Sequence, residues 1–522
     1  MSEPARSASY PALSRREFLR VGAAGGAAVF TADLKAAAGP PAVSKAGRNV
    51  PAFELEELTM AELQARMASG QDTARSLLER YLERIRSLDQ QGPALRQILE
   101  INPDALSTAD ALDAERKAGK LRGPLHGLPI LLKDNIATAD RMTTTAGSLA
   151  LEGCVAPRDA FIVERLRAAG AILLAKTNMS EWANFRSMSS TSGWSARGGL
   201  GRNPYALDRN TSGSSSGAAA AAVAGYAPLH VGTDIGGSVR LPATHCGIFA
   251  LKPSLGRVPI APPYMGRVAG PMTRGVADSA LMMQVLSKPD ARDFMSLPVQ
   301  DIDWSSRPAN PKGLKIGVLP DMKVGLHVRP EVRAACKAAA KALEAQGAEV
   351  SALESFLTPG MLDGTCRFFE ARSYHDLMQL SAERRAKVLP FIAEWCTWRA
   401  AAFSGRDVMQ AYGEVMAMRE AAVRACAPFD FVLSPVSPIL AYEAELPAPN
   451  DDPRDALPHI AFTVPYNMSE QPAASVNWGY GDEGLPIGVQ VIGRRFDDAG
   501  VRRLCALLER LRPPQRAWPD SV

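Results

Sequence analysis

The sequence predicts an α/β fold in which a sheet is covered by helices on both faces. Two observations carry this prediction: short apolar segments alternate with stretches of helical periodicity, and residues 313–353 read as a complete strand–helix–strand unit. The 522-residue chain is 46% hydrophobic and 22% charged, which is typical of a globular protein with a large core. No long polar linker divides it.

The elements of the first half can be placed in order. Helical signals begin at Thr59, which forms a capping box with Glu62, and apolar residues then recur at helical spacing over residues 77–85. From residue 128 the pattern alternates. We expect a buried strand at 128–132, a helix at 160–169 that ends at Gly170, and a strand at 171–175.

The second half continues this alternation and then departs from it. We expect strands at 313–319 and 348–353 around a helix at 331–346, and late strands at 429–434 and 488–493. Residues 360–445 are mainly helical and rich in aromatic side chains. They are either a helical layer packed on the sheet or an insertion that walls a substrate pocket.

The N-terminus has the layout of an export signal. Arg15 and Arg16 precede a short Gly- and Ala-rich apolar stretch at residues 21–32, which is typical of the twin-arginine route. Residues 36–38 offer a small-residue cleavage site, so we expect a signal at 1–38 and a connector at 39–55. This predicts a periplasmic or secreted protein. If the segment is only a basic tail, the protein is cytoplasmic.

Several classes of function are not indicated. The net charge of +4 is too small to predict binding to nucleic acid or to an anionic membrane, and no nucleic-acid-binding motif is present. The six histidines and seven cysteines form no HExxH, HxH or CxxC pattern, so we expect no metal site and no cofactor. No segment predicts stable membrane insertion. Catalysis would therefore use other groups.

The first segment that could carry chemistry is GLPILLKDN, residues 127–135. It places Lys133 at the end of an apolar strand. Burial disfavours the charged form of a lysine and lowers its pKa, which turns it into a base. Taken alone, the same lysine could equally extend from the strand end to water.

Two further segments are rich in glycine and serine. Residues 211–225, TSGSSSGAAAAAVAG, resemble a spacer, but 218–223 is a run of strong helix formers, and such a turn points N–H groups and hydroxyls at one place. Residues 232–240, GTDIGGSVR, follow the apolar stretch 227–231. Consecutive glycines before a serine can expose the N–H groups that an oxyanion hole requires, or serve only a tight turn.

Together, the three segments resemble the amidase signature family of serine hydrolases. The resemblance continues through residues 251–257, LKPSLGR, to residues 484–490, GLPIGVQ. It implies one amidase domain over 56–515, with its signature core at about 125–260 and a helical substrate-side region at about 360–445. It also implies a large mixed central β-sheet covered by helices on both faces.

The family uses a Ser–Ser–Lys triad. The resemblance assigns Ser238 as the nucleophile, Ser214 as the bridging serine and Lys133 as the base. In the family the bridging serine follows a cis peptide bond, within a Gly-Gly-Ser-Ser-Gly-Gly loop. Residues 212–217 read Ser-Gly-Ser-Ser-Ser-Gly here, so two glycines have become serines while the key positions remain.

The same resemblance suggests the groups around the triad. The oxyanion would be held by backbone N–H groups around Ile235, Gly236, Gly237 and Ser238. Three further residues would support the loop from outside it: Ser215, Asp234 and Arg240.

The segments expected to line the substrate pocket resemble two different branches of the family. Residues 177–186 and 192–195 are similar to the peptide amidase branch, and the candidates for the pocket are Met179, Trp182 and Phe185. Residues 463–467, TVPYN, are instead similar to amidases of cyclic or linear oligoamides. Trp182 and Phe185 could also be plain core residues.

The predicted function is hydrolysis of a small carboxylic amide through an acyl-enzyme intermediate. The sequence does not decide whether the protein is a homodimer. Three alternatives remain: a glutamine-dependent amidotransferase A subunit, a non-catalytic binding protein on the same scaffold, and a different hydrolase. In the last, residues 213–217 match GxSxG with Ser215 as the nucleophile. That motif needs an apolar strand directly before it, and residues 203–210 do not form one.

Overall fold

The computed structural model describes residues 52–183, 191–305, 307–449 and 457–516. The described residues all belong to one compact unit. The expected signal at 1–38 and most of the connector lie outside the described residues. No helix of the described residues is long and apolar enough to cross a membrane.

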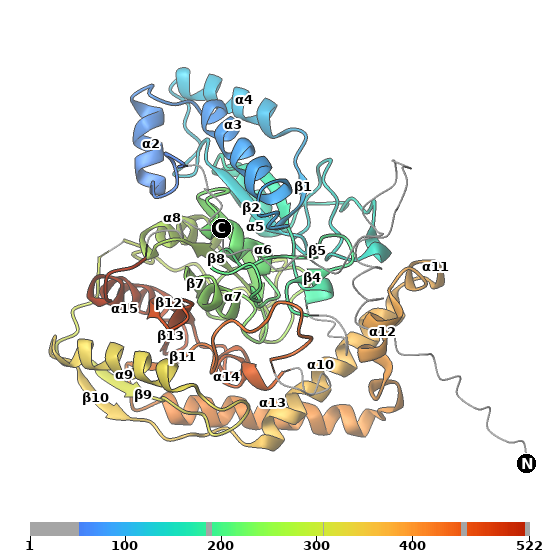
Figure 1. The fold of residues 1–522 in the computed structure, drawn as a ribbon, viewed down its shortest axis with the longest axis vertical. Coiled ribbons are helices and arrows are strands. Elements are labelled where there is room, and N and C mark those ends of the chain that lie inside the picture. Colours follow the sequence, from blue (N-terminus) through green and yellow to red (C-terminus); the bar gives the residue numbers. More distant parts are fainter. Residues whose placement is uncertain (1–51, 184–190, 306, 450–456, 517–522) are drawn as a thin grey trace, which may run out of the picture. The chain divides into compact units, whose positions relative to one another are not determined.

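The centre of this unit is one mixed sheet of 11 strands, in the order β1-β3-β2-β6-β8-β7-β12-β13-β11-β9-β10 (Figure 1). The neighbours β3/β2, β2/β6, β11/β9 and β9/β10 are parallel, and the other neighbouring pairs are antiparallel. The strands, with the separate pair β4/β5, are β1 (Ile98–Ile101), β2 (Pro129–Lys133), β3 (Ile172–Thr177), β4 (Trp194–Ser195), β5 (Gly199–Leu200), β6 (Leu229–Asp234), β7 (Phe249–Lys252), β8 (Val268–Thr273), β9 (Lys315–Val318), β10 (Glu349–Ala352), β11 (Phe431–Pro435), β12 (Ala473–Tyr480) and β13 (Pro486–Gly493).

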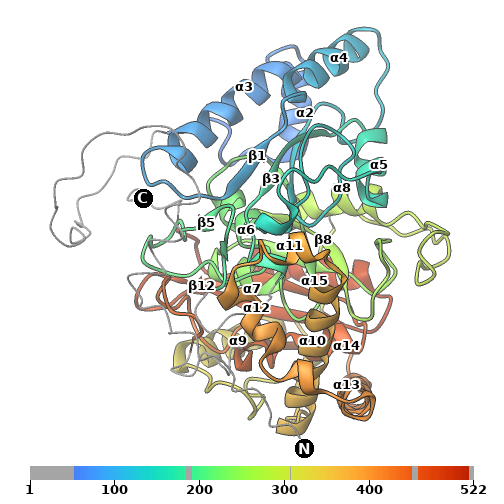
Figure 2. The same ribbon diagram turned by 90° about the vertical axis from the view of Figure 1, so that its right-hand side faces the viewer.

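Helices pack on both faces of the sheet (Figure 2). On one face α6 and α7 lie against the central strands, and on the other α5, α8, α15 and α9 contact one another in succession. The helices are α2 (Met60–Ala68), α3 (Ala74–Ile85), α4 (Ala105–Lys117), α5 (Phe161–Ala168), α6 (Ser216–Val223), α7 (Arg240–His245), α8 (Val276–Leu286), α9 (Pro330–Glu344), α10 (Pro359–Gln379), α11 (Ala382–Arg385), α12 (Pro390–Thr397), α13 (Gly405–Cys426), α14 (Val464–Met468) and α15 (Asp498–Leu511).

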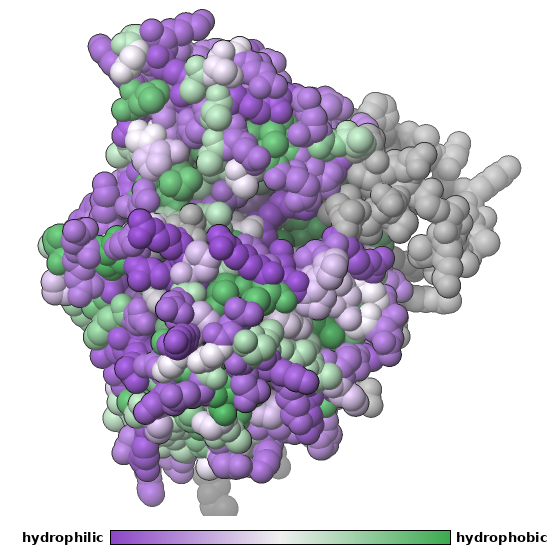
Figure 3. Space-filling model, turned by 90° about the vertical axis from the view of Figure 1, so that its left-hand side faces the viewer, coloured by the Kyte–Doolittle hydropathy of each residue, from purple (hydrophilic) through white to green (hydrophobic). Residues whose placement is uncertain are grey.

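The expected α/β fold with a large mixed sheet is confirmed. The capping box of Thr59 and Glu62 starts α2, and the expected strand–helix–strand unit is β9–α9–β10. The central strand β2 is buried along its whole length, which explains its continuous apolar sequence. The face shown in Figure 3 is largely hydrophilic, with apolar side chains in small separate groups.

Helix α6 is the alanine run of the sequence, and all its residues are buried. Small side chains allow it to approach its neighbours closely. A Cβ at Gly217 would lie 2.5 Å from the carbonyl oxygen of Asn178 and 2.8 Å from that of Gln97. The segment is therefore a packed helix and not a flexible spacer, and its first turn is fixed in the core of the protein.

Candidate active site

The predicted residues lie at the carboxyl edge of two parallel neighbours in the sheet. Lys133 is the last residue of β2, and Asp234 is the last residue of the adjacent strand β6. Ser214 precedes α6, and Ser238 precedes α7. Because parallel strands end at the same edge, the fold brings these four residues together, as α/β sheets commonly do at a ligand site.

Lys133 contacts Ser214 directly. Its Nζ atom lies 2.6 Å from Ser214 Oγ, 3.0 Å from Thr233 Oγ1 and 3.3 Å from the Thr233 carbonyl oxygen. Burial lowers the pKa of Lys133 well below its ordinary value; the charge of Asp234 opposes this shift and that of Arg267 adds to it. The amine is therefore more readily neutral than that of an ordinary lysine.

Ser214 and Ser238 line one cavity of about 290 Å³. The Gly213–Ser214 peptide bond is cis, as the family resemblance implies for the bridging serine. Although both serines are described, no hydrogen bond joins their hydroxyls, and Ser238 Oγ has no protein partner among the described residues. Hydrogen bonds of this kind are often long in proteins without substrate and tighten when it binds.

A buried ion pair holds the loop that carries Ser238. Asp234 accepts the N–H groups of Gly237 at 2.8 Å and Val239 at 2.9 Å, and Arg240 contacts both of its carboxylate oxygens at 3.1 and 3.2 Å. Both side chains are fully buried. Burial alone would raise the pKa of Asp234, but Arg240 and the N–H donors outweigh it and hold the pKa well below its usual range.

The expected set of oxyanion donors needs one correction. The N–H of Gly237 donates to Asp234, so this group is already used. Within the described residues, the N–H groups of Ile235, Gly236 and Ser238 have no acceptor outside the sheet ladder. Gly237 serves the turn instead, because its φ is +123° and a Cβ there would run into Thr463.

Three residues of the C-terminal part support the same loop and are absent from the sequence-based site. Thr463 Oγ1 donates to the Gly236 carbonyl oxygen at 2.6 Å. Asn467 donates to Asp234 at 2.8 Å, and Gln490 accepts from Arg240 at 2.7 Å. The signal that could have found them is polar residues at fully buried positions.

Ser215 is a supporting residue by its contacts. Its hydroxyl is buried, donates to the Thr233 carbonyl oxygen at 3.1 Å and accepts the Thr233 N–H at 3.3 Å. Its N–H donates to the Ser238 carbonyl oxygen at 3.1 Å. The alternative with Ser215 as nucleophile is not favoured, because this hydroxyl is held between backbone groups and no strand of the GxSxG type leads into it.

The cavity around Ser238 has two compartments. The larger one, about 290 Å³, is lined by Ser214, Asn135 and charged side chains. The smaller one, about 30 Å³, is lined mostly by apolar side chains, including Leu241, Phe369 and Trp395, and at its edge also by Arg372 and His459. Phe369 and Trp395 come from α10 and α12, so the helical region walls the pocket as well as packing on the fold.

The three candidates for the substrate pocket have different outcomes. Trp182 lines the larger compartment beside Ser214 and Ser238. Met179 has a relative accessibility of 0%, so the structure places it in the core and not in the pocket. Phe185 lies outside the described residues.

We predict that Arg240→Met destabilises the protein strongly. Removing one partner of a buried ion pair leaves the other charge uncompensated, which costs about 3–5 kcal/mol. The measurement is the free energy of unfolding from urea titration, with Arg424→Met on an exposed position as the matched control. The double variant Arg240→Met/Asp234→Asn should recover part of the loss. A single variant as stable as the parent would contradict the structural role of the pair.

The comparison with protein families shows which family the chain belongs to. The family described as Amidase matches residues 76–501, which is most of the chain. The chain belongs to the amidase family. This confirms the family resemblance that the three motif segments predicted. Lys133, Ser214 and Ser238 all fall within the matched residues.

Three of the proteins that this amidase is similar to differ in the activity that their names state. The A subunit of the glutamyl-tRNA(Gln) amidotransferase of Myxococcus xanthus is 34% identical over 491 residues, covering 88% of this chain and 98% of the relative. The structure of the native peptide amidase from Stenotrophomonas maltophilia matches with a TM-score of 0.79 and 34% identity, covering 89% of this chain and 99% of that one. A 6-aminohexanoate cyclic dimer hydrolase matches with a TM-score of 0.74 and 26% identity, covering 88% and 98%.

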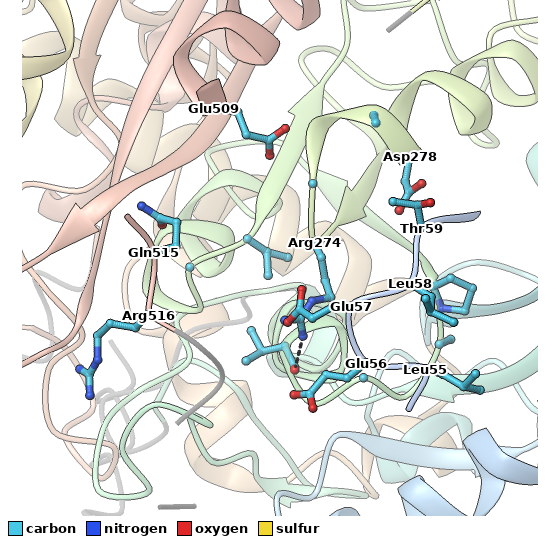
Figure 4. Close-up of a pocket in the computed structure, with 18 of the residues that line it drawn as sticks. Leu55, Glu56, Glu57, Leu58, Thr59, Arg274, Asp278, Glu509, Gln515 and Arg516 are labelled. Atoms are coloured by element: carbon cyan, nitrogen blue, oxygen red, sulfur yellow. Dashed lines mark hydrogen bonds and ion pairs between the residues drawn. The ribbon is translucent and has the colours of Figure 1, made fainter. Parts of the chain in front are cut away.

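A second cavity of this amidase, about 320 Å³, is lined by none of the catalytic candidates; Figure 4 shows residues that line it. Its lining includes Glu57, Arg274 and Glu509, and Arg274 donates to the Val223 carbonyl oxygen at 2.9 Å. Its carboxylates mostly serve structure: Asp278 accepts the N–H of Met60 at 3.1 Å, and Glu509 accepts that of Val276. These contacts fix the starts of α2 and α8.

Proposed function

We propose that this amidase hydrolyses a carboxylic amide C–N bond with Ser238 as the nucleophile and an acyl-enzyme as the intermediate. The observation that carries the proposal is the buried contact of 2.6 Å between Lys133 Nζ and Ser214 Oγ, beside the cavity that Ser238 also lines. A buried amine of lowered pKa next to a hydroxyl is the activation that a serine nucleophile needs without histidine.

The first half of the reaction forms the acyl-enzyme. Neutral Lys133 takes the proton of Ser214 while Ser214 takes that of Ser238, and Ser238 Oγ attacks the carbonyl carbon. The N–H groups of Ile235, Gly236 and Ser238 stabilise the oxyanion. The C–N bond then breaks, the proton returns through Ser214 to the leaving nitrogen, and ammonia or an amine departs.

The second half uses water in the place of the amine. Water gives a proton to the same Ser214–Lys133 pair and attacks the ester carbonyl of the acyl-enzyme. The tetrahedral intermediate collapses, Ser238 regains its proton, and the carboxylic acid leaves. Asp234 and Arg240 act through the backbone of the loop, because their charges are paired with each other and with its N–H groups.

The second candidate function is an amidotransferase A subunit that releases ammonia from glutamine. The similarity to the A subunit of glutamyl-tRNA(Gln) amidotransferase over most of both chains favours it, more directly than it favours a free-standing amidase. The site chemistry is the same in both. The compartment of about 290 Å³ on the Ser214 side has room for a leaving group larger than ammonia, which favours hydrolysis of an amide that releases an amine.

The experiment that tests the proposal uses the single purified chain. We expect release of amine or ammonia from one class within a panel of peptide amides, anilides, oligoamides and glutamine. A fluorophosphonate should label Ser238, as located by mass spectrometry of the peptide. Activity on glutamine alone, or only with a partner protein, would select the amidotransferase. Labelling with no turnover of any amide would contradict hydrolysis, and neither labelling nor turnover would select a binding protein.

We also propose that the chain is exported by the twin-arginine route, on the strength of Arg15, Arg16 and the apolar stretch at 21–32. Replacing both arginines with lysine should keep the protein in the cytosol, as measured by fractionation and immunoblotting. Export of the double variant at the parent level would contradict this route.

A homodimer remains an expectation, for which the mass in solution is the measurement.

A further inference from the structure

The larger compartment of the site carries an excess of positive charge. Arg267 and Asp376 line this compartment and not the smaller one, whereas Arg372 lies at the boundary and lines both. The carboxylate of Asp376 lies 3.7 Å from Arg372 Nε, so these two form an ion pair. The charge of Asp234 is compensated by Arg240, and Lys133 is more readily neutral than an ordinary lysine.

Arg267 is the cation without a counterion. Within the described residues, no carboxylate oxygen lies within 4 Å of its guanidinium nitrogens, so Arg267 forms no ion pair there. Burial lowers the pKa of Arg267 to about 10; the charge of Arg372 adds to this shift, and the charge of Asp376, which is paired with Arg372, opposes it. At neutral pH the group therefore remains charged, and two like charges face one partly enclosed space.

The sheet places Arg267 beside the nucleophile loop. Arg267 directly precedes β8, and the register pairs Val268 with Asp234, which places Arg267 next to Ile235 at the start of the nucleophile loop. Tyr264 holds Arg372 from the side, with the guanidinium carbon 5.5 Å from the ring centroid. The two guanidinium groups are thus arranged around the space beside Ser238, where a planar anion could pair with Arg267.

The proton transfer through Ser214 determines which half of the substrate binds in the larger compartment. The leaving nitrogen must receive its proton from Ser214, so it must face Ser214. Ser214 lines the larger, charged compartment and does not line the smaller one. The amine half therefore lies on the side of Arg267, and the acyl half lies in the small apolar compartment bounded by Leu241 and Trp395.

We infer that the amine half of the substrate carries a carboxylate that binds Arg267, so that the amidase releases an amino acid from a short-chain N-acyl amino acid. This inference rests on the proposed function. It names the substrate class: an amide with a small apolar acyl group and an anionic amine half. Arg267 is then a residue that determines specificity, and it takes no part in the bond changes themselves.

The test uses two matched pairs of substrates. N-propionyl-4-aminobenzoate and N-propionyl-4-toluidine differ by a carboxylate or a methyl group on the amine half. Succinyl anilide and butyryl anilide differ in the same way on the acyl half. We expect the first carboxylate to raise kcat/KM by about tenfold over its methyl partner, as a charge-assisted contact would, and the second to give no gain. Released amine is measured by chromatography.

The variants separate recognition from folding. The charge of Arg267 also helps to lower the pKa of Lys133, so the variants are compared on the plateau of each pH profile, where Lys133 is neutral. There Arg267→Gln should lower kcat/KM about tenfold for the aminobenzoate substrate and less than about twofold for the toluidine substrate, while Arg267→Lys keeps part of the preference. Arg424→Gln is the exposed control and should change neither. An equal loss on both substrates would overturn the inference, and so would a preference for the carboxylate on the acyl half.

A binding measurement separates this inference from the proposed function. Ser238→Ala cannot form the acyl-enzyme, so calorimetry can follow its binding of N-propionyl-4-aminobenzoate without turnover. We expect binding that weakens about tenfold when Arg267→Gln is added. Unchanged binding in the double variant would overturn the role of Arg267 even if hydrolysis is intact. Binding without hydrolysis in the parent would contradict the proposed function and leave the recognition by Arg267 supported.

Discussion

Ser238→Ala should lower kcat by about 10⁴- to 10⁶-fold, because no other group can attack the amide carbonyl and only binding and the oxyanion donors would remain. The measurement is amine release under single-turnover conditions, on whichever amide the parent cleaves. The melting temperature should stay close to that of the parent, since among the described residues the hydroxyl of Ser238 has no protein partner to lose.

Two neighbouring serines serve as controls. Ser215→Ala should reduce the rate only moderately, because its hydroxyl holds the backbone of Thr233. Ser216→Ala should be nearly silent, since its Oγ is buried and lacks a hydrogen-bond partner among the described residues. Full activity of Ser238→Ala together with an inactive Ser215→Ala would reverse the roles and restore the GxSxG interpretation.

Lys133→Met should lower kcat/KM by about 10²- to 10⁴-fold, the usual contribution of a general base. Lys133→Arg should be as inactive, because a guanidinium group does not give up its proton near neutral pH. In the parent, the base form exists above the lowered pKa of Lys133. We therefore expect kcat/KM to rise with pH through that pKa and to fall below it, where the amine is protonated.

Lys176 provides the matched control for a buried lysine. It lies on the adjacent strand β3, burial lowers its pKa to about 8, and it donates to the Ile136 carbonyl oxygen and to Thr144, both at 2.8 Å. Lys176→Met should cost stability but keep kcat and the pH profile of the parent. A pH profile that shifts with Lys176 and not with Lys133 would contradict the assignment of the base.

The sequence alone could predict the local features of the site. Each of these features depends on a few consecutive residues: a lysine at the end of an apolar strand, an alanine helix after a serine turn, and a double glycine before Ser238. The hydrogen bond from the Gly237 N–H to Asp234 also had a local signal. Asp234 stands only three residues earlier, and aspartate side chains in turns commonly accept N–H groups of the residues that follow them.

Long-range features could not be predicted in this way. Thr463 and Asn467 contact a loop more than 220 residues away, and this contact depends on the order of strands in the sheet. Met179 and Trp182 lie three residues apart, yet the first is in the core and the second lines the pocket, and Trp182 has a φ of +53°. Such a backbone value is rare for tryptophan and is set by its surroundings rather than by its neighbours in sequence.

The position of the β12–β13 hairpin has a consequence for when activity arises. This hairpin comes last among the strands of the chain, yet it lies between β7 and β11 and joins the two halves of the sheet. Gln490 on β13 also bonds Arg240 under the nucleophile loop. A ribosome must therefore translate almost the whole message before the active site can form. A prematurely terminated product that lacks this hairpin should be inactive.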